Sequence, residues 1–273
     1  MQDRYAGDVG DFLNFALLRL LMAPAEDRVE RSLGVIWYRV PDERHNDDGK
    51  HITYLDDGNR IGARLRSLDP DLHRRLAGVV RGGRSVARIE ASGALPAGTV
   101  TFPDLLDLRA ARGATARQAL RDRWIDAARS RVEGCDLVFV DPDNGARRAG
   151  HPVPRHRPSA GKHAYLDELA PIVRRGQSLM IYHHADRSGP VEQQIAARLD
   201  ELRGELPEHP PLAAVRASRG STRLFLLVAA PGHDAWLADR LRRIEGTRWA
   251  EELRVTWARS RPDVGAAPAQ NRA

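Results

Sequence analysis

The sequence predicts an α/β fold: a doubly wound, mostly parallel sheet that closes with an antiparallel hairpin near its C-terminal end. Short apolar, β-branched segments alternate with segments of helical periodicity, which is typical of a parallel sheet covered by helices on both faces. Strand-like segments at 213–218 and 222–229 are separated only by Arg219, Gly220 and Ser221, which is the spacing of a hairpin. A length of 273 residues and a 42% hydrophobic composition support one domain over 1–258, followed by a flexible tail at 259–273.

In the first part of the chain the elements alternate as this fold requires. Residues 11–22 are apolar nearly all round and predict a helix, with Asp11 as a cap and Pro24 beyond its end. Residues 33–40 are apolar, β-branched and aromatic, and predict a buried strand. A polar, turn-rich loop insertion follows at 41–59. A helix is then expected at 69–81, a strand at 85–90 and a weaker strand at 98–102.

The second part continues the alternation. An arginine-rich amphipathic helix is expected at 114–132, and the run DLVFV at 136–140 is the clearest strand of the chain. A helix at 162–174, a strand at 178–182 and a helix at 191–205 lead into the hairpin, and a last helix is expected at 234–244. Because ligands of doubly wound sheets bind beyond the carboxyl ends of the strands, functional residues are expected directly after strands.

Composition limits the classes of protein. The 43 basic residues outnumber the 37 acidic ones, but only Lys50 and Lys162 are lysines, so 41 are arginines. Codon usage in a GC-rich genome explains much of this arginine, and no compact basic tract indicates a nucleic-acid surface. The single Cys135 excludes an internal disulfide and a cysteine-cluster zinc site. No apolar run approaches the ~18 residues of a membrane helix, and the polar, acidic N-terminus is unlike a signal peptide, so a cytoplasmic protein is expected.

The sharpest polar cluster is the segment Asp141-Pro142-Asp143-Asn144-Gly145, directly after the strand at 136–140. A strand that delivers Asp-Pro into a loop places the carboxylate at the carboxyl edge of the sheet, and the proline stiffens the turn. Such an aspartate can accept a hydrogen bond from an amine, act as a base or hold a metal. The same residue types also make ordinary turns, but the position at a strand end favours function.

Other candidates are weaker. His183 and His184 follow the strand at 178–182, and adjacent side chains of an extended segment point to opposite sides, so one of them can face Asp141. Glu90 is expected to end its strand, where a carboxylate can accept from a ribose diol. The loop at 41–51 is dense in oxygen and imidazole ligands for a divalent ion, but it is not a calcium-loop pattern and a solvated loop explains it better; these ligands are Asp42, Glu43, His45, Asp47, Asp48 and His51.

These landmarks, in this order, resemble the large-subunit ribosomal RNA adenine-N6 methyltransferases, which are class I S-adenosylmethionine (SAM) enzymes of Rossmann-like fold. The segment YAGDVGDFLNF at 5–15 is similar to that family's H-A-G-N-x-A-D-x-L-K-H, and Ala6, Gly7, Asp11 and Leu13 match. Arg88-Ile89-Glu90 resembles the strand that ends in the glutamate on the cofactor ribose. Phe102-Pro103-Asp104 is placed like the Ala-Asp that faces the adenine end of SAM. Asp141-Pro142 matches the first half of the catalytic D-P-P-Y, and the terminal hairpin fits a methyltransferase sheet.

Three positions depart from the family pattern. Asn14 stands where the family has a lysine, and Asp143-Asn144 stand in place of the Pro-Tyr of D-P-P-Y. Residues 38–48 replace the family's glycine-rich cofactor loop, so Tyr38 is expected at the cofactor. The resemblance implies that cofactor-binding residues surround SAM; these are Tyr5, Gly7, Asp8, Asp11, Tyr38, Glu90 and Asp104.

The resemblance implies methyl transfer to an amine nitrogen. Asp141 and the Pro142 carbonyl would accept from the target amine, with Asp143, Asn144 and His183 beside them, and alignment would supply most of the rate. The acceptor could be a nucleic-acid base, a small molecule or a peptide side chain.

Two alternatives remain open. A nuclease or hydrolase could hold Mg²⁺ or Mn²⁺ through Asp141, Asp143 and His183. A degenerate relative could bind a nucleic acid or protein partner without turnover.

Overall fold

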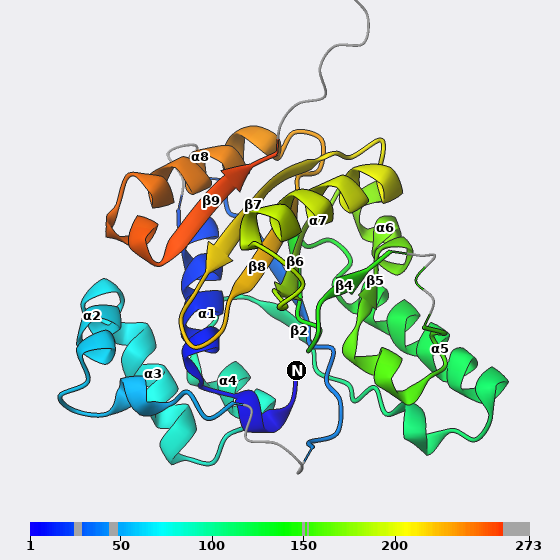
Figure 1. The fold of residues 1–273 in the computed structure, drawn as a ribbon, viewed down its shortest axis with the longest axis horizontal. Helices are drawn as coiled ribbons and strands as arrows, with labels where there is room; N and C mark the ends of the chain where they lie inside the picture. The colour runs from blue at the N-terminus through cyan, green and yellow to red at the C-terminus, as the bar shows by residue number, and fades with distance from the viewer. Residues whose placement is uncertain (25–28, 44–48, 149–150, 152, 259–273) are drawn as a thin grey trace, which may run out of the picture.

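A computed structural model shows a central mixed sheet between two layers of helices (Figure 1). The structure describes residues 1–24, 29–43, 49–148, 151 and 153–258, and the predicted tail at 259–273 lies outside them. The helices are α1 (Val9–Leu21), α2 (Arg60–Leu68), α3 (Pro70–Arg81), α4 (Val86–Ser92), α5 (Ala114–Arg131), α6 (Leu166–Arg174), α7 (Val191–Glu205) and α8 (Asp234–Glu245). The strands are β1 (Leu33–Ile36), β2 (Val100–Phe102), β3 (Leu137–Val140), β4 (Ala146–Arg147), β5 (Ala164–Tyr165), β6 (Ser178–His184), β7 (Pro211–Ala217), β8 (Arg223–Val228) and β9 (Leu253–Trp257).

Seven strands of the described chain form one sheet in the order β2-β1-β3-β6-β8-β7-β9. The pairs β2–β1, β1–β3 and β3–β6 are parallel, whereas β6–β8, β8–β7 and β7–β9 are antiparallel. Five strands, β7 included, therefore run in one direction, and β8 and β9 run against them. The predicted α/β fold with a mostly parallel sheet and a closing antiparallel hairpin is confirmed, and it is compatible with a Rossmann-like fold.

Both faces of the sheet are covered because its central strands are apolar on both sides. In β3, Leu137 and Phe139 pack into the core beneath α1 and α8, whereas Val138 and Val140 pack into the core beneath α5, α6 and α7. Successive side chains of a strand point to opposite faces, so an uninterrupted apolar strand needs helices on both. This arrangement leaves the strand ends as the edge where polar groups can gather.

The strand predicted at 85–90 is wrong, because this segment is the helix α4. The Ser85 hydroxyl accepts a hydrogen bond from the Arg88 amide at 3.2 Å, which caps the first turn, and Gly93 ends the helix with a φ of 71°. Val86 and Ile89 lie three residues apart and are both buried. The caps and this spacing override the β-branched composition of the segment.

Smaller differences concern element ends and short elements. The strand predicted at 33–40 ends at Ile36, and the helix predicted at 162–174 begins only at Leu166, after β5. The helix α2, the short strands β4 and β5 and the edge strand β9 were not predicted. The insertion at 41–59 contains a 3-10 helix at Thr53–Leu55. Within the described ranges, none of the helices has the length and apolar character needed to cross a membrane.

Candidate functional site

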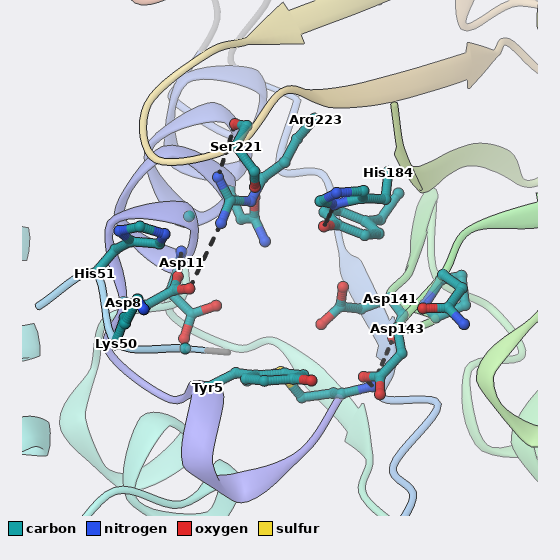
Figure 2. Close-up of a pocket in the computed structure, with 17 residues that line it drawn as sticks. Tyr5, Asp8, Asp11, Lys50, His51, Asp141, Asp143, His184, Ser221 and Arg223 are labelled. Atoms are coloured by element: carbon teal, nitrogen blue, oxygen red, sulfur yellow. Dashed lines mark hydrogen bonds and ion pairs between the residues drawn. The ribbon is translucent and has the colours of Figure 1, made fainter. Parts of the chain in front are cut away.

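A cavity of about 320 Å³ lies at the carboxyl edge of β3 and β6. It is bounded by the N-terminal segment, the first turn of α1, residues 49–51, the loop after β3, the end of β6 and the turn between β7 and β8. Figure 2 shows Asp8 and Asp11 across this cavity from Asp141 and Asp143. Arg223 and His184 lie above these carboxyl groups in the same view. The volume is at the lower end of the range for small-molecule sites, which is about 300–1,000 Å³.

The first turn of α1 contributes two carboxyl groups because they cap the helix. Asp8 is the N-cap and accepts from the Asp11 amide at 3.0 Å, and the Asp11 carboxylate accepts from the Gly7 amide at 2.8 Å. Gly7 has a φ of 84°, a conformation that favours glycine at this bend. Burial, followed by the nearby charge of Asp8, raises the pKa of Asp11 well above its ordinary value.

Asp141 supplies a third buried carboxyl group, from the end of β3. Its amide donates to the Ile36 carbonyl at 3.1 Å, and its side chain is only 5% exposed and faces the cavity. The pKa of Asp141 is raised to about 6, mainly by burial; the Met1 amine and Arg223 lower it, and the charges of Asp143 and Asp8 add to the rise. A carboxyl group with this pKa can exchange a proton close to neutral pH.

The Asp143 carboxylate binds the N-terminal segment of the chain. Its Oδ1 lies 2.6 Å from the Met1 amine, and its Oδ2 accepts from the Gln2 amide group at 2.7 Å. The Met1 amine also donates to the Tyr38 carbonyl at 2.7 Å. These contacts fix the floor of the cavity beside Asp141.

Arg223, the first residue of β8, is the cationic counterpart of these carboxylates. It is 6% exposed, donates to the carbonyls of Arg219 and Ser221 at 2.8 and 3.1 Å, and lies 3.5 Å from the Asp8 carboxylate. A Cβ on Gly10 would lie 2.3 Å from this guanidinium, so any other residue at this position would have to displace the buried Arg223 side chain. Sequence reasoning missed Arg223; a glycine within an otherwise apolar helix was the signal that something packs closely there.

Asn14 adds an unpartnered acceptor to the wall. It lies one turn of α1 beyond Asp11, is 4% exposed, and its Oδ1 is buried without a hydrogen-bond partner among the described residues. The Tyr182 hydroxyl lies 3.4 Å from His184 Nδ1 on the opposite wall. Because buried polar atoms are nearly always satisfied, an orphaned oxygen that lines a cavity points to a ligand donor.

The structure brings together only part of the predicted cofactor site. Tyr5, Asp8 and Asp11 line the cavity, and Gly7 orients Asp11 through its amide. Together with Pro142, Asn144 and the aspartates of the same loop, they surround one space.

The remaining predicted cofactor residues lie outside the cavity. Glu90 is on α4 rather than at a strand end, and its carboxylate accepts from Trp37 Nε1 at 2.9 Å. Tyr38 is fully buried against Trp124 in the core beneath α5. Asp104 is exposed, and its carbonyl accepts from Trp124 Nε1 at 3.0 Å.

His183 faces away from Asp141. Its Nδ1 accepts from the Ala146 amide at 3.2 Å, and its side chain lines a second cavity of about 570 Å³. Gly145 makes this contact feasible: it has a φ of 93°, and a Cβ there would lie 2.4 Å from His183 Nδ1. His184 also lines the second cavity, but of the two histidines it alone lines the first.

Among the described residues, no group of three or more His, Cys, Asp or Glu side chains is arranged to hold a metal ion. In the acidic loop, His51 lines the first cavity and Glu43 lies 2.5 Å from Lys162 Nζ. His45, Asp47 and Asp48 lie outside the described residues.

The fold and the site define an α/β protein with a carboxylate-rich cavity at the carboxyl edge of its sheet. Comparison of the chain with protein-family models, with curated proteins and with solved structures gives no match.

Proposed function

We propose that the protein is an enzyme that transfers a methyl group to an amine nitrogen, with the first cavity as its active site. The observation that carries this proposal is the Asp141 carboxyl group, which follows the central strand and faces a cavity built also from the first turn of α1. This is the juxtaposition that the resemblance to methyltransferases implies. The antiparallel β7–β8 hairpin at the end of the parallel strands supports the same proposal.

SAM fits this cavity at one end only. Its methionine part carries an ammonium and a carboxylate, for which Asp8 and Arg223 are suitable partners. Its nucleoside part lacks the expected partners, because Tyr38, Glu90 and Asp104 lie elsewhere and Glu90 is occupied by Trp37. These three residues therefore do not form a binding site for the nucleoside. The residues of the cavity define only how the acceptor amine is bound.

The chain's own residues define what happens to the acceptor. A neutral amine that enters the cavity meets Asp141, whose carboxylate accepts one N–H and leaves the nitrogen lone pair free to attack. As the nitrogen forms its bond to the methyl carbon, the bond from that carbon to the donor sulfur would break and the sulfur would leave as a neutral thioether, while the proton of the now cationic nitrogen passes to the Asp141 carboxylate. Burial keeps competing water away from this hydrogen bond and strengthens it.

Equilibrium dialysis with labelled SAM tests the proposal. We expect the folded wild-type protein to bind SAM, and Arg223→Gln and Asn14→Ala to bind it at least about tenfold more weakly, since each removes a charged or buried hydrogen bond. Glu90→Gln is the matched control, because Glu90 lies outside the cavity, and it should bind as the wild type does. Absence of SAM binding by protein with a native circular dichroism spectrum refutes the proposal.

A further inference from the structure

The second cavity is the larger of the two and adjoins the first. It lies between the loop after β3, the end of β6 and α7, and has a volume of about 570 Å³. Asn144 and His184 line both cavities. The segment 141–148 therefore carries Asp141 at one end and the arginines of the second cavity at the other.

Arg147 is half-buried in this cavity without a counterion. Its guanidinium contacts His151 Nε2 and lies 2.9 Å from His163 Nε2, and its Nε is buried with no hydrogen-bond partner in the described part of the chain. No carboxylate of the described residues forms an ion pair with Arg147 or with its exposed neighbour Arg148. The guanidinium groups of Arg147 and Arg148, which line this cavity, therefore have no ion-pair partner among the described residues.

The histidines around Arg147 are uncharged near neutral pH, so they do not change the net positive charge of this cavity. Burial, followed by the charge of Arg147, lowers the pKa of His163 to about 3. Burial, followed by the charge of Arg198, lowers the pKa of His183 to about 4. Because His183 Nδ1 accepts from the Ala146 amide, its proton is on Nε2, which is a donor.

The two carboxylates of the cavity are already engaged. Glu201 Oε1 lies 2.8 Å from Arg198 Nη2, and Asp186 Oδ1 accepts from the Ser188 amide at 2.8 Å. Neither one forms an ion pair with Arg147 or Arg148, although the positive charge of Arg148 favours the ionised form of Glu201. The walls thus combine two unpaired guanidinium groups with an imidazole donor, which is a set of donors suited to an oxyanion.

We propose that the second cavity binds the phosphate group of a phosphate ester, with Arg147 and Arg148 as its charged donors. Guanidinium groups match phosphate oxygens with two parallel hydrogen bonds, and a partly buried guanidinium without a counterion gains most from such a partner. Because Asn144 and His184 line both cavities, the rest of the ester can extend from the second cavity toward the first. The proposal does not depend on methyl transfer.

Isothermal titration calorimetry without any methyl donor tests it, with adenosine 5′-monophosphate, adenosine and a short single-stranded oligonucleotide as probes. We expect the monophosphate or the oligonucleotide to bind, adenosine to bind at least about tenfold more weakly, and Arg148→Gln to weaken phosphate binding at least about tenfold. Arg174→Gln, an exposed arginine of α6 that lines neither cavity, is the charge-matched control and should bind as the wild type does.

The outcomes separate the sources of the phosphate. Binding of the monophosphate identifies a small phosphate ester as a ligand. Binding of the oligonucleotide alone identifies a nucleic-acid single strand as the ligand. In that case the slope of log binding constant against log salt concentration should be smaller in magnitude by about 0.7 for Arg148→Gln than for the wild type. Arg147→Gln should act in the same direction, but Arg148→Gln decides because Arg148 is exposed and its loss leaves no buried group unpaired. Equal binding of adenosine and its monophosphate, equal weakening by Arg174→Gln, or no binding of either phosphate probe overturns the proposal.

Discussion

Replacing Asp141 with asparagine should stabilise the folded protein at neutral pH while removing the carboxylate that the proposed reaction uses. Burial raises the pKa of this carboxyl group from its ordinary value of 3.8 to about 6. A difference of about two pKa units corresponds to about 3 kcal/mol, because one unit is 1.36 kcal/mol. Ionised Asp141 therefore costs the folded state about 3 kcal/mol at pH 7, and asparagine of the same shape removes that cost.

The pH dependence has a defined sign. The folded state binds the Asp141 proton more tightly than the unfolded state does, so the free energy of unfolding falls as the pH rises from about 4 to about 6. Below this window the carboxyl group is protonated in both states and the cost disappears. The variant lacks the titration, so its advantage should grow from near zero at pH 4 to about 3 kcal/mol at pH 7.

Urea unfolding at several pH values between 4 and 8 measures this difference, and a thermal melt at pH 7 should show a midpoint higher by roughly 6–12 °C. Asp57→Asn, at an exposed position of the loop before α2, is the matched control and should stay within about 0.5 kcal/mol of the wild type. If the advantage of Asp141→Asn is the same at pH 4 as at pH 8, the buried carboxylate is not its cause and the reasoning fails.

Two further changes test the scaffold around the cavities. Arg121→Met removes the main partner of the Glu168 carboxylate, which Arg121 holds through contacts of 2.7 and 2.8 Å, so urea unfolding should show a loss of about 3–5 kcal/mol. Replacing Glu168 with leucine as well should restore part of this loss, because the carbonyls of Ala160 and His163 still lack the donors of Arg121; a loss below about 1 kcal/mol in the single variant would contradict the prediction. Gly145→Ala places a side chain at a positive φ and in overlap with His183, so its midpoint of thermal unfolding should fall further than that of Gly113→Ala. At Gly113 the φ is also positive, but no atom lies within 4 Å of the new Cβ. Equal losses in the two variants would show that the overlap with His183 has no effect on stability.

The sheet could be predicted because its signals are local and strong. The run at 136–140 is apolar on both faces, so its burial between two helical layers follows from side-chain alternation alone. The segment 85–90 was wrongly predicted as a strand because its composition favours one. Its helical structure depends instead on the cap at Ser85 and the bend at Gly93. The edge strand β9 was overlooked because it is short and buries only Leu253 fully, so its pattern is weak.

The acidic half of the site could also be predicted, and its basic half could not. Asp8 and Asp11 are fixed by local capping, and Asp141 by the end of its strand, so sequence position determines where their carboxyl groups lie. Arg223 meets Asp8 only because β8 pairs with β6 and brings a residue 215 positions away over the first turn of α1. No local sequence pattern predicts that contact; only the absence of a side chain at Gly10, within an otherwise apolar helix, indicates that another group packs closely there.

The loop after β3 connects the two cavities and gives their proposed roles a common geometry. Over eight residues it passes from Asp141, through the bend at Gly145, to Arg147 and Arg148. Its β4 residues, Ala146 and Arg147, pair with β5, and the helix α6 that follows β5 is tied to α5 by the ion pair of Glu168. Arg147 is therefore held on a paired strand, and Arg148 directly follows that strand. A ligand anchored by its phosphate in the second cavity would thus meet Asp141 at a fixed distance, and a substrate without the phosphate should lose both affinity and alignment.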